Sequence, residues 1–402
     1  MKAPKTDHHL RIGMFSWESM YSVRVGGLAQ AVTNLSQALA KKGHEIHLFT
    51  RIGENQPEYE QINGVHYHRC RFDPGNNFLE FARNMCEAMV RRFHATEETV
   101  GKFDLIHGHD WLVVDALHEL KNKGHPIILT FHSTEYGRNG SEFGNWWEFR
   151  EISNKEWYGS FIADRVTTVS RAMKNELMWL YGTPEWKIDI APNGGYIQQF
   201  RKKVDPGRIK ERYGIHPLAP VVLFVGRLVH QKGPDLLIEA IPYVLRHRGD
   251  VKFIIVGGGD EGMRDYLERR ARELKILDSV RFLGYVPDKE YTDILNACDI
   301  VCIPSRNEPF GLVLFEAWAA GKAVVATDVG GLSENIENFV DGIKVFEYPE
   351  SIAWGINYIV NDPVGVRWLG ANGRKKLRKL TWSRQAIKYE RIYTRLTQNI
   401  KN

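Results

Sequence analysis

Residues 221–233 read VVLFVGRLVHQKG, in which five apolar residues are followed at once by a loop that begins and ends at glycine. An unbroken apolar run of this length is typical of a strand buried on both faces of a parallel sheet. Similar short apolar runs alternate with helix-length segments on both sides of this stretch. The alternation predicts repeated strand–helix–strand units, which place ligand-binding loops at the carboxyl ends of the strands.

The alternation falls into two series. The first predicts a helix at 28–42 and strands at 12–15, 46–50, 65–70, 105–107, 127–131, 166–169 and 188–191. The second predicts strands at 221–225, 253–256, 280–283, 300–303 and 323–327. Between them, the charged stretch 200–220 carries three prolines and predicts a linker. We therefore expect an α/β fold with two Rossmann-like, doubly wound parallel-sheet domains, 1–205 and 206–382, facing across a cleft, and a helix at 383–402 that can cross back to the first domain.

The composition excludes several classes of protein. With 402 residues, 43% hydrophobic and 26% charged, the chain is typical of a soluble globular protein rather than a disordered or fibrous one. The net charge of +5 is too small for a dedicated nucleic-acid binder, although basic residues in the last helices leave peripheral membrane contact open. Residues 1–11 lack a signal-peptide core, so we expect a cytoplasmic protein. We expect buried free thiols at Cys70, Cys86, Cys298 and Cys302.

Two glycine-rich loops are candidate anion sites. The loop RVGGL at 24–28 leads into a helix, so the N–H groups around Gly26 and Gly27 can approach an anion, with a plain turn as the alternative. The loop GGGDEG at 257–262 fits the G-x-G-x-x-G pattern of nicotinamide-dependent dehydrogenases. It lies in the second unit of its domain, however, and Asp260 and Glu261 stand where a phosphate would bind, so a tight turn is favoured.

A histidine-rich motif, HGHD at 107–110, follows the strand predicted at 105–107. Clustered His and Asp residues can ligate a metal, but no further histidines at supporting spacings accompany them, so a hydrogen-bonding loop is favoured and no metal is expected. His109 lies beyond the predicted strand and is the better candidate for the cleft. His132 occupies the equivalent place after the strand at 127–131, and a hydrogen-bonded core histidine is the alternative for both.

The second domain carries charged residues in two strand-to-helix loops. Arg227 and Lys232 bracket a loop suited to gripping a diphosphate, with a surface loop as the alternative. In EPFGLVLFE, Glu308 precedes a buried helix and Glu316 lies about one and a half turns inside it, where carboxylates can accept hydrogen bonds from vicinal hydroxyls. Glycoside hydrolysis by paired carboxylates is the competing chemistry, but it requires two acids on opposed loops.

Together these motifs resemble the retaining nucleotide-sugar glycosyltransferases of the GT-B fold, specifically family 4 and the bacterial and archaeal glycogen synthases. The resemblance spans nearly the whole chain, through RVGGL at 24–28, HGHDW at 107–111, VSR at 169–171, PNG at 192–194, GRLVHQKG at 226–233 and the pair Glu308 and Glu316. The segment TFHSTEYGR at 130–138, with EWY at 156–158, resembles the glycogen-synthase-like branch. The sequence departs from that branch where Arg24 replaces the usual Lys and where Gly195 and Tyr196 replace Val-Asp.

The resemblance implies roles for individual residues. Arg227 and Lys232 would bind the donor diphosphate together with Gly26 and Gly27, and Glu308 would hold hydroxyls of the donor sugar. The amides of Phe310, Gly311 and Leu312 would support sugar and phosphate, and Glu316 would bind the ribose. The acceptor and sugar side would be lined by His109, Asp110 and His132, and the catalytic set would be His109, Arg227, Lys232 and Glu308.

The resemblance also implies a reaction. A hexosyl group, expected to be glucosyl, would pass from ADP-glucose or UDP-glucose to an α-glucan by front-face substitution with retention, without a metal, cofactor or protein nucleophile. A family 4 enzyme acting on a lipid or small-molecule acceptor and a non-catalytic sugar-nucleotide-binding protein are the alternatives. The sequence leaves the nucleobase, the acceptor and the oligomeric state open.

Overall fold

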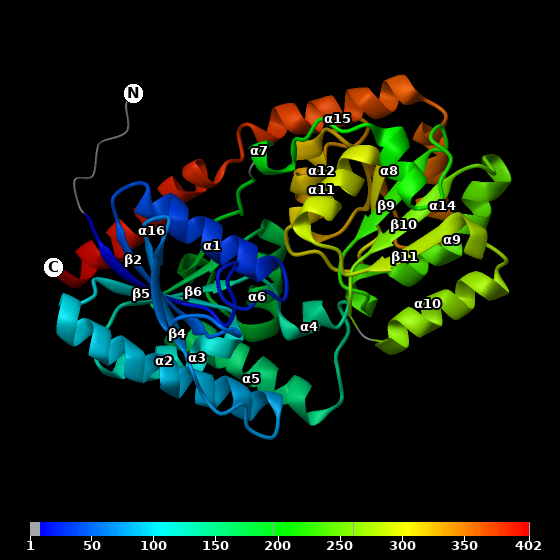
Figure 1. Ribbon diagram of the computed structural model, residues 1–402. Coiled ribbons are helices and arrows are strands. Elements are labelled where there is room, and N and C mark those ends of the chain that lie inside the picture. The colour runs from blue at the N-terminus through cyan, green and yellow to red at the C-terminus, as the bar shows by residue number, and fades with distance from the viewer. Residues whose placement is uncertain (1–8, 196, 260, 402) are drawn as a thin grey trace. The chain divides into compact units, whose positions relative to one another are not determined.

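The chain folds into two compact units, each built around one sheet (Figure 1). A computed structural model describes residues 9–195, 197–259 and 261–401, so Asp260, Tyr196 and most of the stretch 1–11 discussed above lie outside the described residues. Unit 1 comprises the described residues up to Glu135, then Gly144–Gly194 and the C-terminal segment from Trp382. Unit 2 comprises Tyr136–Phe143 and Gly195–Thr381.

The sheet of unit 1 has the strand order β3-β4-β2-β1-β5-β6-β7-β8. The chain moves outward from β1 in one direction and then returns to add β5 on its other side, which is the doubly wound arrangement that the sequence predicts. The strands are β1 (Arg11–Phe15), β2 (Glu45–Arg51), β3 (Tyr59–Ile62), β4 (Val65–Cys70), β5 (Leu105–His109), β6 (Ile127–Phe131), β7 (Arg165–Thr168) and β8 (Ile188–Ile190). The helices are α1 (Gly27–Ala40), α2 (Phe78–Val100), η1 (Trp111–Val113), α3 (Val114–Asn122), α5 (Trp147–Ile162), α6 (Arg171–Tyr181), η2 (Glu185–Lys187) and α16 (Trp382–Lys401), with α4 (Glu135–Arg138) leading into the segment that belongs to unit 2.

The sheet of unit 2 is parallel throughout, in the order β11-β10-β9-β12-β13-β14. Alternate residues of its strands form one core with α9, α10 and α14. The strands are β9 (Val221–Val225), β10 (Lys252–Val256), β11 (Val280–Gly284), β12 (Ile300–Ile303), β13 (Ala323–Thr327) and β14 (Ile343–Val345). The helices are α7 (Ile197–Phe200), α8 (Pro206–Arg212), η3 (His230–Lys232), α9 (Pro234–His247), α10 (Glu261–Glu273), η4 (Leu277–Ser279), α11 (Asp288–Ala297), α12 (Leu312–Ala320), α13 (Gly330–Asn335), α14 (Pro349–Val360) and α15 (Pro363–Leu377).

The stretch 200–220, expected as a linker, contains the helix α8 instead. Asp205 caps this helix by accepting hydrogen bonds from the N–H groups of Gly207 and Arg208 at 3.0 and 3.3 Å. The Lys210 side chain is buried, and its ammonium group donates to the Asp299 carboxylate at 2.9 Å. Asp205 and Lys210, two of the charges that made the stretch look like a linker, therefore cap or pair within the fold, and the two units divide at Gly194 and Gly195.

The C-terminal helix α16 belongs to unit 1, where it lies beside α1 (Figure 1). It presents three large rings that are almost fully buried, those of Trp382, Tyr389 and Tyr393. The Tyr393 hydroxyl is hydrogen-bonded to His107 Nδ1 at 2.8 Å, and Thr130 Oγ1 is 2.6 Å from His107 Nε2. Both ring nitrogens of His107 are thus hydrogen-bonded to other side chains in the core of unit 1.

Two expectations from composition can be compared with the structure. All four cysteines are buried free thiols, as predicted. Within the part of the chain that the structure describes, no helix is both long enough and apolar enough to span a membrane.

The glycines of the GGGDEG loop allow backbone to pack on backbone. Gly257 has φ 143° and Gly259 has φ 158°, and a Cβ at Gly257 would overlap the carbonyl oxygen of Gly226. Leu228 N–H donates to the Gly258 carbonyl at 2.9 Å, which ties this loop to the one after β9. The glycines at 257–259 thus form a tight turn, as the sequence favours, and they allow the loops after β9 and β10 to pack closely.

Replacing Gly257 by alanine should destabilise unit 2, because the new Cβ meets backbone that cannot move aside. We expect Gly257→Ala to lower the free energy of unfolding by about 2 kcal/mol or more. Gly258→Ala is the matched control, since no atom of the described residues lies within 4 Å of its ideal Cβ, and it should stay within about 0.5 kcal/mol of the wild type. Urea unfolding measures both values, and equal effects would contradict this account of the loop.

A stack of histidines fills part of unit 1 between β2 and β4. The His47 ring lies 4.6 Å from His66 and 5.1 Å from His68, and His68 stacks on Phe49 at 4.7 Å. His47 Nδ1 is hydrogen-bonded to His68 Nε2 at 2.9 Å. Burial, followed by the neighbouring His47, Arg92 and His66, lowers the pKa of His68 to about 3. His68 is therefore neutral in the folded protein at neutral pH.

Acid should weaken unit 1 through His68. Between the ordinary pKa of His, about 6.5, and the folded value of about 3, the unfolded chain binds a proton that the folded chain does not, so stability falls as the pH falls. We expect His68→Phe to flatten the dependence of unfolding free energy on pH by up to about 1.4 kcal/mol per pH unit. Urea titrations from about pH 7 to about pH 5 measure the slope, with the exposed His118→Phe as control. An unchanged slope in His68→Phe would refute the assignment.

Candidate active site

In unit 2, the loops after β9 and β12 bring together two residues that the sequence singles out. Lys232 Nζ lies 2.8 Å from Glu308 Oε2, and both side chains are largely shielded, with 21% and 13% of their surfaces exposed. The Ser305 hydroxyl donates to the same carboxylate oxygen at 3.3 Å. An ion pair with this degree of shielding holds both charges in fixed positions without removing either from solvent completely.

Glycines set the distance between these loops. Gly233 has φ 62°, and a Cβ there would overlap the carbonyl oxygen of Pro304 at the end of β12. Gly331 N–H donates to the Glu308 carbonyl at 2.7 Å, and a Cβ at Gly330 would overlap the same oxygen. Main-chain contacts on both sides therefore fix the backbone that carries Glu308.

The helix α12 begins at Leu312, four residues after Glu308. Gly311, at φ 93°, is its N-cap and supplies no side-chain cap. The first N–H groups of a helix have no partners within the helix and carry partial positive charge, so this end of α12 suits an anion or a hydroxyl oxygen. Phe310 is buried and anchors the loop by packing on Phe315 with ring centroids 4.8 Å apart.

Arg227 lies on the same loop as Lys232 and is exposed. Its Nη2 donates to the Gln231 side-chain oxygen at 3.4 Å. Gln231 is itself buried, and its carbonyl accepts from the N–H of Arg306 at 2.9 Å, which joins the β9 loop to the β12 loop. The Arg227 guanidinium is thus tethered to a buried residue, although the side chain as a whole is exposed.

Glu316 stands on α12, one turn beyond its start. Its Oε2 accepts a hydrogen bond of 2.5 Å from the hydroxyl of Tyr291 on α11. The carboxylate is half-buried, and the Tyr291 hydroxyl orients it.

In unit 1, the residues of the HGHD motif meet His132. His109 Nδ1 is hydrogen-bonded to His132 Nε2 at 3.1 Å. The main-chain N–H of His132 donates to Asp110 Oδ1 at 2.7 Å. Burial lowers the pKa of both histidines, so their rings are neutral. The prediction that His109 lies beyond its strand is wrong, because β5 continues to His109 and buries it completely.

Two features of this cluster are unusual for a core. His109 Nε2 is buried and has no hydrogen-bond partner among the residues that the structure describes, which costs free energy unless a ligand or water completes it. Asp110 has φ 60° and ψ 176°, a backbone conformation that non-glycine residues rarely adopt. The unpaired nitrogen and the strained backbone lie in adjacent residues, and such features cluster at functional sites.

The RVGGL loop binds an anion that belongs to the protein itself. The N–H groups of Val25 and Gly26 donate to Glu18 Oε2 at 2.5 and 2.9 Å. Glu18 is buried, and this burial raises the pKa of its carboxyl although the two N–H groups and Arg51 act in the opposite direction. The predicted anion-binding geometry is present, and an internal carboxylate occupies part of it.

Comparison with known proteins identifies the family. The model for Glycosyltransferase Family 4 matches residues 25–195, and the model for Glycosyl transferases group 1 matches residues 207–376. An uncharacterised glycosyltransferase of Methanocaldococcus jannaschii is 36% identical over 395 residues, covering 96% of this chain and 98% of the relative. The chain belongs to the family-4-like glycosyltransferases.

Further similarities span almost the entire glycosyltransferase chain. A glycogen synthase of Mycobacterium tuberculosis is 28% identical over 404 residues, covering 96% of this chain and 94% of that protein. The solved structure of sucrose-phosphate synthase from Thermosynechococcus elongatus superimposes with a TM-score of 0.82 at 26% identity, covering 97% of this chain and all of that one. The predicted GT-B fold class is confirmed.

Some residues of the glycosyltransferase that adjoin these clusters were not predicted. Asn307, next to Glu308, donates to Ser141 Oγ at 3.0 Å, while its Oδ1 is buried without a partner. Ser141 belongs to Tyr136–Phe143, the segment from the first half of the chain that packs within unit 2. The TFHSTEYGR motif at 130–138 marks the start of this segment, and the small size of Gly137 and Gly140 lets it approach Asn307 and His230.

The Lys232–Glu308 pair should contribute a measurable coupling energy. Each of Lys232→Met and Glu308→Gln removes the ionic partner of a shielded charge. The losses of unfolding free energy in the two single variants should therefore add up to more than the loss in the double variant. We expect a coupling of about 1 to 2 kcal/mol in a double-mutant cycle of urea unfolding. The exposed pair Glu87 and Arg91 on α2 is the control, with an expected coupling below about 0.5 kcal/mol. Additive single changes at Lys232 and Glu308 would disprove the coupling.

Proposed function

We propose that this glycosyltransferase transfers glucose from ADP-glucose or UDP-glucose to an α-glucan, with retention of the anomeric configuration and without a metal ion. The observation that carries the proposal is the contact of Lys232 with Glu308 beside the start of α12. A cation for the phosphate and a carboxylate for the sugar hydroxyls are what a nucleoside-diphosphate sugar requires on either side of the bond that breaks.

The leaving diphosphate would be stabilised by Arg227 and Lys232. A charge pair at ~4 Å is worth about 4 kcal/mol at an effective dielectric near 20, so two cations can lower the barrier to departure substantially. When the diphosphate engages Lys232, Glu308 becomes available to accept hydrogen bonds from donor-sugar hydroxyls. The amides of Phe310, Gly311 and Leu312 would support sugar and phosphate, and Glu316 the ribose.

In unit 1, we assign the 25–27 loop, with Gly26 and Gly27, to the donor phosphate, and His109, Asp110 and His132 to the sugar and acceptor. Because the pKa of His109 is lowered by burial, its Nε2 would act as a neutral hydrogen-bond donor or acceptor rather than a cation. The departing phosphate oxygen would accept the proton of the acceptor hydroxyl, so no side chain is assigned as nucleophile.

Two observations bear on the acceptor. Similarity to the Mycobacterium tuberculosis glycogen synthase over 96% of the chain supports a glucan. Similarity to sucrose-phosphate synthase, whose name denotes a small sugar phosphate, favours a small-molecule acceptor as the second candidate.

Transfer assays test this proposal. Wild-type protein should release the nucleoside diphosphate from ADP-glucose or UDP-glucose and extend maltooligosaccharides, with unchanged rates in EDTA and an α-linkage by proton NMR. Lys232→Met and Glu308→Gln should each lower kcat/KM roughly 100-fold or more, whereas the exposed Lys289→Met should not.

Three outcomes would contradict the proposal in different ways. Transfer only to sugar phosphates would favour the second candidate. Loss of activity in EDTA would remove metal independence. Binding of sugar nucleotides without turnover on any acceptor would indicate a non-catalytic binding protein.

A further inference from the structure

Large aromatic side chains gather on the surface of unit 2 at the carboxyl end of β14. Phe346 and Tyr348 follow the strand with 67% and 49% of their surfaces exposed, and Trp354 projects from α14 with 48% exposed. Phe339 and Tyr358 extend the group. We call these five residues the aromatic platform. The rings form two contacting groups, Phe346 with Tyr348 and Trp354 with Phe339 and Tyr358, and members of both groups line one cavity. Exposed aromatic rings gathered around a cavity are uncommon on a globular protein and mark an interaction surface.

The rings of the platform are held in order. The Phe346 and Tyr348 rings are parallel within 6°, with centroids 6.0 Å apart, while the Trp354 ring meets the edge of Phe339 at 6.4 Å. The Phe346 N–H donates to Ser351 Oγ at 2.9 Å, which fixes the turn between β14 and α14. A ligand would therefore meet rings on a backbone that is already ordered, which reduces the entropic cost of binding.

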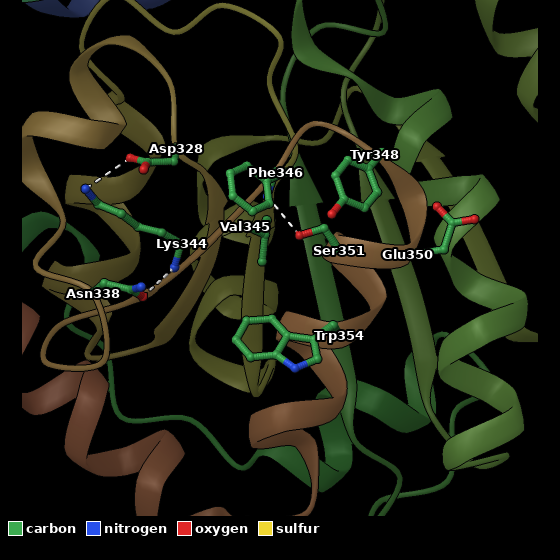
Figure 2. A pocket seen from close by; sticks show the side chains of 9 residues that line it. All are labelled: Asp328, Asn338, Lys344, Val345, Phe346, Tyr348, Glu350, Ser351 and Trp354. Atoms are coloured by element: carbon green, nitrogen blue, oxygen red, sulfur yellow. Dashed lines mark hydrogen bonds and ion pairs between the residues drawn. The ribbon is translucent and has the colours of Figure 1, made fainter.

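A cavity of about 470 Å³ opens beside the platform (Figure 2). This volume is within the range of small-molecule sites. Its lining combines aromatic and polar side chains: Asp328, Asn338, Lys344, Val345, Phe346, Tyr348, Glu350, Ser351 and Trp354.

The polar groups of the cavity are fixed but retain hydrogen-bonding capacity. Lys344 Nζ lies 3.0 Å from Asp328 Oδ1, and the Tyr243 hydroxyl donates to Glu350 Oε1 at 2.8 Å. Asn338 Oδ1 accepts from the Lys344 N–H at 2.9 Å. Each carboxylate can accept further bonds, so hydroxyl donors would find acceptors around the rings.

This combination fits a carbohydrate chain. A pyranose ring presents an apolar C–H face, which packs on an aromatic ring, and a rim of hydroxyls, which bonds to carboxylates and amides. The rim has two carboxylates, Asp328 and Glu350, against one ammonium group, Lys344, so it does not attract an anionic membrane or a nucleic acid. We propose that the aromatic platform and its cavity form a second, non-catalytic binding site for an α-glucan chain.

The position of the site suits a long acceptor, and this part of the inference rests on the glucan acceptor proposed above. Asp328 lines the cavity, and three residues later Gly331 donates to the Glu308 carbonyl at 2.7 Å. Three residues span at most roughly 11 Å, so a glucan in the cavity lies within a few sugar units of the Glu308 loop. The site would hold a polymer near the point of transfer.

Affinity electrophoresis through gels that contain glycogen tests the site. The full-length double variant Phe346→Ala/Trp354→Ala should bind glycogen roughly tenfold more weakly than the wild type, because two stacking rings are lost. The matched control Tyr266→Ala/Trp368→Ala removes two exposed rings elsewhere on unit 2 and should bind as the wild type does. Melting temperatures establish that both variants are folded.

Kinetic measurements separate this site from the proposed activity. In the platform variant, KM for glycogen should rise roughly tenfold while transfer to maltose stays unchanged. If the wild type binds glycogen through the platform but transfers no glucose, the site stands and the proposed function fails.

Four results would overturn the site. The first is that glycogen does not retard the wild-type protein, and the second is that the platform variant binds glycogen as tightly as the wild type. The third is that the wild type, but not the platform variant, sediments with lipid vesicles. The fourth is that the wild type, but not the platform variant, forms dimers in light scattering. The last two would assign the platform to a membrane or to a second copy of the chain.

Discussion

Contact of backbone with backbone positions the charged groups of unit 2. At Gly257 against Gly226, Gly233 against Pro304 and Gly330 against Glu308, no Cβ fits between the two main chains. Loops at neighbouring strand ends are consequently closer together than side-chain packing would permit, and Lys232 reaches Glu308 across that short separation at 2.8 Å. The chemistry that we propose depends on these glycines as much as on the charged residues, because a lysine on a freely moving loop could not be held beside one carboxylate.

The parts of this arrangement that follow a local rule could be predicted from the sequence. Strands buried on both faces are continuous apolar runs, so all the longer parallel strands were found, and Lys232 and Glu308 were expected to be near each other because parallel strands end at one edge. The edge strand β3 was missed because its residues are mostly exposed, so burial imposes no pattern on them. The edge strand β14 was missed because its buried, alternating pattern is only three residues long. The helix α8 was hidden by charges whose partners, such as Asp299 for Lys210, are far away in sequence.

Contacts between distant segments account for most of what the sequence did not reveal. Glu18 precedes the RVGGL loop by only a few residues, but nothing in its neighbourhood shows that its carboxylate turns back to the Val25 and Gly26 amides. The packing of Tyr136–Phe143 within unit 2 and the burial of Asn307 Oδ1 depend on the tertiary fold alone. Such residues become visible only when hydrogen-bond donors and acceptors are counted in three dimensions.

Both anion-binding features of the protein hold an internal carboxylate: Glu18 at the amides of the 25–27 loop and Glu308 at Lys232. These internal carboxylates affect which phosphate-containing ligands the protein would bind. Free phosphate arriving at Lys232 would displace Glu308 and leave that carboxylate beside another anion, which is unfavourable at a shielded site. A sugar diphosphate would bring hydroxyl donors to Glu308 together with phosphate for Lys232, so both partners remain satisfied. Internal pairing of this kind would therefore favour ligands that carry phosphate and sugar in one molecule over ligands that carry phosphate alone.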